Sequence, residues 1–413
     1  MTTIIRARAA HDFLALIPTL VGYRPSRSLL CVAFEGNRTA GVFRHDLPHS
    51  ARARESLVEA LVGTLCRMDH VDALVPIAYT EARFGDGGLP ERALLEGVVR
   101  RAEEAGFLVR DALCVGADGW GSLLDEELPP GGRSLELVES SPLTRHPEAL
   151  RDPADSAAAL VRIPDSDPAL AGRIDEVLAS LRAPVPGDGV AEADDHASAA
   201  LVPDALLDLD DVIGDALDPL VAAELLARGV AGRSPEMLAW LVHLAACPVF
   251  RDAMMLQVAF GPVIGELALD AAEDAHRLDA MAEPEGESDA GGDSDGGGDP
   301  DEGGESTEAF LSRLLLGQAS GRPDVERIER ALETLVVAIA NAPAPDRAGA
   351  MCVAGWLAWA LGRGSSAGAL IDAALEADPE LTMAGLLHRF IGSGAMPEWA
   401  FSPAIPSEAG RGR

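Results

Sequence analysis

The order of apolar patterns in the first 125 residues most constrains the fold of this chain. Strand-like and helix-like segments alternate there, whereas from residue 205 onward only helical patterns occur. The expected order is αββαβαββ, with segments at 10–21, 29–34, 39–46, 51–68, 71–79, 89–105, 107–115 and 120–124. Helices that alternate with strands imply a mixed, partly parallel sheet. We therefore predict an α/β N-terminal domain followed by an all-α half built of helical hairpins.

Composition divides the chain into six predicted regions. These are an α/β domain (1–125), a variable Pro/Gly/Asp-rich connector (126–205), a helical region (206–282), a disordered acidic Gly/Asp linker (283–308), a helical-hairpin region (309–395) and a flexible tail (396–413). The acidic linker consists almost wholly of Gly, Asp, Glu, Ser and Pro. Such a segment cannot bury apolar area, so we predict that it is disordered.

Two prolines mark irregular positions in the predicted elements. Pro18 lies inside the first helix and predicts a kink or a break there, because proline cannot donate a helical hydrogen bond. Pro76 lies inside the strand at 71–79 and predicts an edge position or a bulge.

The charge of the chain excludes several classes of function. Its net charge is −34, and the acidic residues are spread along the whole sequence. Such a field repels phosphate backbones and anionic lipids, so we expect neither a nucleic-acid nor a membrane partner. The chain contains no lysine, which fits either a GC-rich genome or a halophilic host. Schiff-base and Walker-A lysine chemistry are therefore excluded.

The cysteines predict neither a metal site nor a disulfide framework. They are Cys31, Cys66, Cys114, Cys247 and Cys352, odd in number and without CxxC spacing. This usage is typical of reduced, buried thiols. The N-terminus lacks the apolar core of a signal peptide. We therefore expect a cytoplasmic protein with no cofactor and no structural metal.

The stretch LIPTLVGYRPSRSLLCVAF (16–34) holds the strongest candidate for a ligand site. A polar loop, Tyr23–Ser28, joins an apolar helix to a strand. Arg24 and Arg27 could bind an anionic group with help from Ser28 and backbone N–H groups. The alternative is a plain turn, in which Gly22 ends the helix and Tyr23 covers the core edge. Both interpretations remain open from the sequence.

HDLPH (45–49) is a second candidate, because it places His45, Asp46 and His49 close together. Successive strand residues point to opposite faces, so His45 and Asp46 should diverge and a metal site is disfavoured. Asp46 and His49 could instead help to cap the helix that begins near residue 51. We retain Asp46 as a weak ligand-binding candidate with the loop residues.

Several other motifs are better explained by packing. GADGWG (116–121) lacks the helix that a dinucleotide fingerprint requires, so Trp120 is expected in the core. Trp356 and Trp359 stand at i and i+3 of one helix and should also be core residues. His243, on an apolar helix, is expected to be a buried histidine. No GxSxG elbow occurs, so no catalytic triad is predicted.

Four stretches together resemble a known family. They are DFLALIPTLVGYRPSRSLLCVAF (12–34), GVFRHDLP (41–48), LCVGADGWGS (113–122) and GWLAWALGRGSSAGALIDAALEADPELTMAGLL (355–387). As a set they are similar to an actinobacterial family catalogued as domain of unknown function 4192. The resemblance implies an architecture and no activity. Family members often carry a cysteine after the Trp hairpin, but DEELPPGG (125–132) has none here.

One C-terminal segment, ALIDAALEADPEL (369–381), also resembles the second helix of a tetratricopeptide hairpin. Ala374, Asp378 and Pro379 occupy the positions of its small alanine and closing Asp-Pro. This resemblance implies helix hairpins that present a surface to a protein partner.

Two functional hypotheses follow. The first is a non-catalytic binding or scaffold protein, with a partner surface on the helical half and a small anionic ligand at the α/β domain. The second is a hydrolase or nucleotide-acting enzyme, whose site would lie at the carboxyl ends of the sheet strands. Its candidate residues are Tyr79, Thr80, Glu81 and Asp46.

Overall fold

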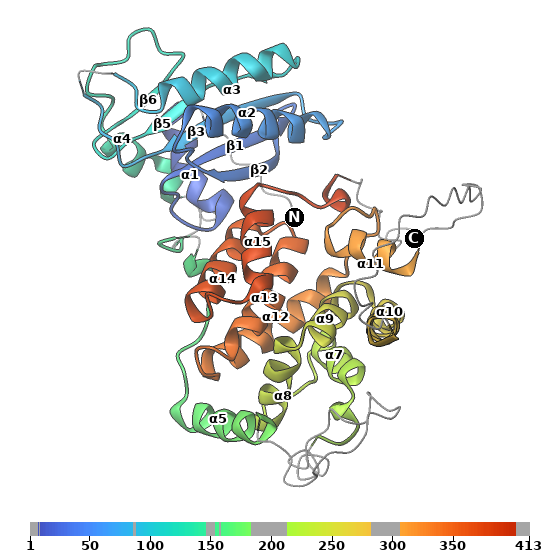
Figure 1. Cartoon of the computed structure of the whole chain (residues 1–413). Helices are drawn as coiled ribbons and strands as arrows, with labels where there is room; N and C mark the ends of the chain where they lie inside the picture. Colours follow the sequence, from blue (N-terminus) through green and yellow to red (C-terminus); the bar gives the residue numbers. More distant parts are fainter. Residues whose placement is uncertain are drawn as a thin grey trace, which may run out of the picture. The chain divides into compact units, whose positions relative to one another are not determined.

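The computed structural model describes residues 7, 9–85, 88–145, 153–156, 158–182, 213–281 and 306–401. The chain divides into two compact units (Figure 1). The sheet unit comprises residues 1–162 with 364–369 and 389–395, and the helical unit comprises 163–363 with 370–388 and 396–413. The predicted linker, 283–308, lies outside the described residues except at its last three positions.

The sheet unit contains a six-stranded mixed sheet in the order β2-β1-β3-β5-β6, with β4 also paired to β3. Its elements are α1 (Ala10–Val21), β1 (Ser28–Glu35), β2 (Arg38–Asp46), α2 (Ala51–Cys66), β3 (Ala73–Tyr79), α3 (Arg92–Glu104), β4 (Leu108–Val109), β5 (Leu113–Val115), β6 (Trp120–Ser122) and α4 (Glu136–Glu139). β1 is antiparallel to β2 and β3, whereas β4 and β5 are parallel to β3. The predicted α/β architecture is therefore confirmed.

Helices cover both faces of this sheet (Figure 1). On one face Leu14 and Ile17 of α1 pack in a core cluster with Leu30 and Val32 of β1. Side chains alternate between faces along a strand, so Leu29 and its odd-numbered neighbours on β1 face the other side. There α2 and α3 supply their fully buried leucines, Leu61, Leu65, Leu94 and Leu95.

Pro76 is in the interior of the sheet, so the predicted edge position is wrong. β3 pairs with β1 on one side, where Pro76 lies opposite Cys31 without a register shift. On the other side β4 pairs with β3 up to Leu74 and β5 begins to pair at Ile77. Pro76 therefore faces a gap between two short strands, where no neighbour needs its missing N–H. The segment predicted as one strand at 107–115 is broken at this gap.

Pro18 does not break the first helix, since α1 continues to Val21. Of the two predicted alternatives, a kink or a break, the break is therefore wrong. A proline removes only one N–H donor from the helix, and the buried side chains of Leu14 and Ile17 hold this helix against the sheet.

The helical unit is built from helices alone within its described residues. They are α5 (Pro168–Arg182), α7 (Pro219–Ala227), α8 (Pro235–Ala246), α9 (Pro248–Phe260), α10 (Pro262–Met281), α11 (Thr307–Leu315), α12 (Val325–Asn341) and α13 (Arg347–Ala360), with parts of α14 (Gly364–Ala377) and α15 (Thr382–Gly392). Every residue of α13 from Ala348 to Ala360 is buried, so this helix is the centre of the core. Whether the C-terminal hairpins have tetratricopeptide geometry stays a prediction.

Two boundaries differ from the sequence prediction. Ser306 caps α11 by accepting a hydrogen bond from the N–H of Ala309, so the linker's last residues are helical. The predicted flexible tail begins with packed residues, because Trp399 is 4% exposed and its indole donates to the carbonyl of Ala360. A buried aromatic ring with a satisfied N–H anchors this segment.

Within the described residues, no single helix has the length and apolar character needed to cross a membrane. α8 and α9 together meet the length and composition criteria, but the two helices are bent by 109° relative to each other.

Candidate functional site

The residues predicted to bind a ligand meet at one end of the sheet. β1 begins at Ser28, which lies opposite Asp46, the last residue of β2, and opposite Tyr79, the last residue of β3. Because β1 is antiparallel to both neighbours, its start lies between their carboxyl ends. We call this region, comprising the loop Tyr23–Ser28 with Asp46 and residues 79–81, the sheet end.

Backbone contacts fix the path of the loop into the sheet end. Gly22 ends α1 in the left-handed conformation at φ 86°, as the sequence predicts. The N–H of Arg24 donates to the carbonyl of Ala154 at 2.8 Å, and the N–H of Ala154 donates to Gly22 at 3.0 Å. Tyr23 is buried, and its hydroxyl lies 3.2 Å from the Ser365 hydroxyl in the same unit. Tyr23 therefore anchors the loop.

The two loop arginines have exposed side chains. Among the described residues, the Arg24 side chain makes no ion pair or hydrogen bond, so its guanidinium is not needed for the turn. Arg27 Nε lies 3.9 Å from Glu81 Oε1, and these two side chains are 75% and 80% exposed. Such an exposed pair contributes little stability. The backbone of Arg27 has φ 40°, a conformation that side chains other than glycine rarely adopt.

Ser28 is the most unusual residue of the sheet end. It is fully buried, and its hydroxyl has no hydrogen-bond partner among the described residues. A buried polar group normally has a partner, because leaving it unpaired costs free energy. Its cross-strand neighbour Asp46 is engaged elsewhere, since Arg44 Nη2 donates to its carboxylate at 2.6 Å.

Burial favours the neutral forms of Tyr79, which lies opposite Ser28, and of two cysteines in the strands of the sheet. Burial raises the pKa of Tyr79, and the nearby Tyr23 raises it further. Burial also raises the pKa values of Cys31 and Cys114 to about 12, so both thiols stay protonated at neutral pH. The Thr80 hydroxyl accepts a hydrogen bond from the N–H of Ala82 and serves a turn.

The HDLPH residues are separated as expected. His45 lies opposite Leu29 and Asp46 opposite Ser28, so their side chains point to opposite faces. Burial lowers the pKa of His45, and the neighbouring Arg44 lowers it further. The capping prediction is wrong, because Ser50 caps α2 by accepting a hydrogen bond from the N–H of Ala53. No group of metal-binding side chains forms in the part of the chain that the structure describes.

The remaining motifs serve packing. Trp120 is 4% exposed, lies in the core of the sheet unit, and donates its indole N–H to the Ser134 carbonyl. Trp356 and Trp359 are buried in α13. His243 is only half-buried and stacks on Trp240 with ring centres 5.4 Å apart.

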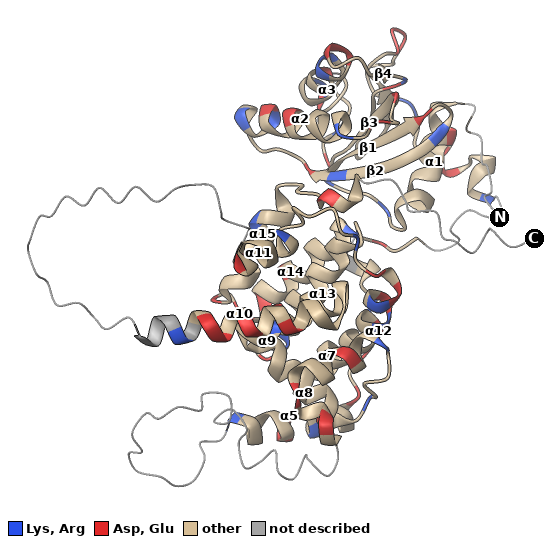
Figure 2. Cartoon of the chain, turned by 90° about the vertical axis from the view of Figure 1, so that its right-hand side faces the viewer, with Lys and Arg blue, Asp and Glu red and all other residues tan. Residues whose placement is uncertain are grey.

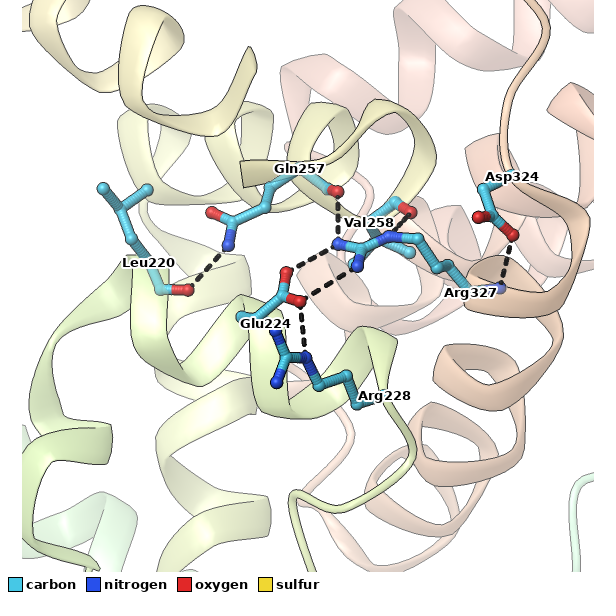
Figure 3. A network of polar contacts seen from close by, with 7 residues as sticks. All are labelled: Leu220, Glu224, Arg228, Gln257, Val258, Asp324 and Arg327. Atoms are coloured by element: carbon cyan, nitrogen blue, oxygen red, sulfur yellow. Dashed lines mark hydrogen bonds and ion pairs between the residues drawn. The ribbon is translucent and has the colours of Figure 1, made fainter. Parts of the chain in front are cut away.

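One polar network in the helical unit was not predicted from the sequence (Figure 3). Glu224 of α7 accepts two hydrogen bonds from Arg327 of α12 and one from Arg228. Arg327 also donates to the carbonyls of Gln257 and Val258 in the last turn of α9. With so many acidic residues in the chain, no sequence signal distinguishes Glu224 from the others.

An open pocket of about 380 Å³ adjoins this network. Its lining residues are Ala259, Phe260, Gly261, Arg322, Asp324 and Arg327. Asp324 caps α12 through the N–H of Arg327, so it is committed to the helix start. The exposed valines Val263 and Val325 follow directly in the first turns of α10 and α12.

Comparison with known proteins identifies the family of this chain. The model of the family described as domain of unknown function (DUF4192) matches residues 11–278 and 319–398. The chain belongs to this family. No curated protein and no solved structure matches it. In this DUF4192 member the matched residues include the whole sheet end and the Glu224–Arg327 network.

Proposed function

We propose that this protein is a non-catalytic binding protein whose sheet unit takes a small anionic ligand at the sheet end. One observation carries the proposal. Arg24 and Arg27 have exposed side chains in the loop that leads into Ser28, whose buried hydroxyl has no partner among the described residues. Arginines that the turn does not need, in a chain of net charge −34, are available for an anion.

The chemistry of the neighbouring groups favours binding over catalysis. Asp46 is paired with Arg44, and the raised pKa of Tyr79 keeps its hydroxyl protonated at neutral pH. The alternative, a hydrolase or nucleotide-acting enzyme, is supported by the convergence of Asp46 and Tyr79 on either side of Ser28. Carboxyl ends of strands are the usual place for ligands in α/β sheets.

We further propose that the helical unit binds a protein partner. The pocket lined by Arg327, and the exposed Val263 and Val325 that lie close to its lining residues in the sequence, support this proposal.

The test compares two double variants of the full-length protein. Arg24→Gln/Arg27→Gln removes two positive charges from the sheet end. Arg38→Gln/Arg100→Gln removes two from exposed positions on β2 and α3 and serves as the control. Calorimetric titration with pyrophosphate and with citrate should show salt-sensitive binding that only the first variant loses. Equal binding by both variants, or no binding by the wild type, would overturn the proposal. Turnover of an anion released from the native protein would favour the enzyme alternative.

A further inference from the structure

The pocket of the helical unit lies close to the point where the described chain ends. Trp399 is buried, and its ring centre lies 5.5 Å from that of Phe260, which lines the pocket. The indole N–H of Trp399 donates to the carbonyl of Ala360 at 3.0 Å, which fixes this contact. The described residues stop two positions later, at Phe401. The rest of the sequence therefore starts near the pocket.

A second contact holds the same stretch of chain near another lining residue. The N–H of Glu398 donates to the carbonyl of Gly317 at 2.6 Å. A Cβ at Gly317 would lie 2.8 Å from a side-chain atom of Pro397, so the two segments are in close contact. From Gly317 the chain reaches Arg322, which lines the pocket, in five residues. Residues 397–399 thus contact two segments that lead into the pocket.

Residues 402–413, which we call the C-terminal segment, are long enough to reach the pocket. They lie outside the described residues, and Ile405 is their largest apolar residue. A fully extended chain spans about 3.5 Å per residue, so Ile405 can lie up to roughly 14 Å from Phe401. The pocket holds about 380 Å³, whereas pockets for small ligands start at roughly 300 Å³. An isoleucine side chain therefore fits.

The lining of the pocket favours an apolar occupant. Residues 259–261, at the end of α9, supply its apolar part. The charge of Arg327 is already neutralised by Glu224. Val263 and Val325, which follow lining residues in the sequence, are 65% and 55% exposed. Covering such groups with an apolar side chain is favourable, because it removes apolar surface from water.

Charge distinguishes the C-terminal segment from the acidic linker as an occupant. Residues 283–305 of the linker contain ten acidic residues, no arginine and no apolar residue larger than one alanine and two prolines. The C-terminal segment contains two arginines and one glutamate, a net charge of +1. Figure 2 shows acidic positions along α10, the helix that follows the pocket-lining Gly261; they are Glu266, Asp270, Glu273 and Asp274. Their field repels the linker and attracts the C-terminal segment.

We infer that the C-terminal segment occupies this pocket, with Ile405 against Phe260. The inference goes beyond the proposed function, because it states what fills the pocket in the chain alone and stands whether or not a protein partner binds there. A tethered segment has an effective concentration on the order of millimolar, so even weak docking gives high occupancy. A partner that uses the pocket has to displace the segment.

Disulfide trapping in the full-length protein tests this inference. Ser407→Cys places a near-isosteric thiol two residues beyond Ile405. Gly321→Cys places the second thiol beside Arg322 of the pocket. Gly321 is exposed, lacks a positive φ and has open space around its Cβ position, so the substitution should be tolerated. Peptide mapping after mild oxidation distinguishes this bridge from bridges to native cysteines.

Gly172→Cys is the control position. Gly172 is an exposed residue of α5 with equally open surroundings. The N–H of Asp167, just before α5, donates to the side chain of Asn341, the last residue of α12. The pocket adjoins the first turn of the same helix, whose 17 residues span about 25 Å. The control thiol is therefore distant from the pocket.

Ser407→Cys/Gly321→Cys should form its intramolecular disulfide about tenfold faster or more than Ser407→Cys/Gly172→Cys does. Adding Ile405→Asp should slow the reaction about tenfold or more, because an apolar lining disfavours a buried charge. Adding Ala409→Asp makes the same charge change and should leave the rate unaltered. Equal rates for the two cysteine pairs, or no effect of Ile405→Asp, would overturn the inference. Bridges formed mainly between two chains would overturn it in favour of a second copy as the occupant.

Discussion

Arg327 and Glu224 form a two-point hydrogen-bonded ion pair that joins helices distant in sequence. Nη1 of Arg327 lies 3.0 Å from Oε1 of Glu224, and Nη2 lies 2.7 Å from Oε2 (Figure 3). Their side chains are 15% and 18% exposed. Because Arg327 also donates to two carbonyls at the end of α9, one guanidinium connects α7, α9 and α12. Its position at the carboxyl end of a helix is electrostatically favourable.

Replacing one partner of this pair should destabilise the protein. Glu224→Gln leaves the Arg327 charge without its carboxylate in a largely buried place, and we expect a loss of roughly 2–4 kcal/mol in the free energy of unfolding. Glu326→Gln is the matched control, because its side chain is 80% exposed and, among the described residues, pairs only with Arg330. The control should stay within about 0.5 kcal/mol of the wild type. Urea unfolding measures the free energy of unfolding of both variants. Equal losses would contradict a stabilising role of the Glu224–Arg327 pair.

The same pair predicts a pH dependence of stability. Hydrogen bonds from Arg327 lower the pKa of Glu224 from 4.5 to about 2, although partial burial opposes the shift. A carboxylate with a lowered pKa in the folded state stabilises the protein above its unfolded pKa. This contribution, about 3 kcal/mol, should be complete above pH 4.5 and be lost as pH falls from 4.5 to 2. In Glu224→Gln, this part of the loss of unfolding free energy at low pH should disappear. If the variant and the wild type lose stability equally between pH 4.5 and 2, Glu224 is not its source.

Local sequence patterns predicted the elements of the sheet unit because each is defined by short-range periodicity and turn chemistry. Gly22 is an example, since a left-handed helix end favours glycine whatever lies around it. Pro76 shows the limit of such reasoning. Whether a proline fits an interior strand depends on the gap between β4 and β5, which only the paired sheet reveals.

Part of the candidate site could be named from the sequence, because local sequence patterns mark loops whose residues are contiguous. The loop residues Tyr23–Ser28 are contiguous and carry a recognisable composition, so they could be named from the sequence. The partners of Ser28 across the sheet depend on strand order and register, which local patterns do not give.

The left-handed stop at Gly22 can be tested by substitution. At φ 86° a side chain is strained, and a Cβ there would lie 3.2 Å from a methyl group of Leu160. Gly22→Val should therefore lower the free energy of unfolding by more than 1 kcal/mol. Gly63→Ala is the contrasting variant, because Gly63 lies in the exposed interior of α2 with open space around it. It should raise stability by up to about 1 kcal/mol, and thermal melting of both variants would show the opposite signs.

Ser28→Ala is the sharpest test of the sheet end, because stability and binding should change in opposite directions. The Ser28 hydroxyl is buried without a partner among the described residues, so its removal should leave stability unchanged or raise it by up to about 2 kcal/mol. Ser141→Ala is the matched control. Ser141 is also buried, but its hydroxyl donates to Asp12 at 2.7 Å, so this variant should lose about 1–3 kcal/mol.

If a ligand uses the Ser28 hydroxyl, Ser28→Ala should bind pyrophosphate more weakly while it unfolds at equal or higher urea concentration. Sites for ligands commonly retain groups that cost stability in the free protein. Ser141→Ala should show the reverse, with lower stability and unaltered binding. A Ser28→Ala protein that loses as much stability as Ser141→Ala would show that the hydroxyl has a partner in the folded chain. The buried hydroxyl would then belong to the structure of the turn, and the exposed arginines alone would carry the binding proposal.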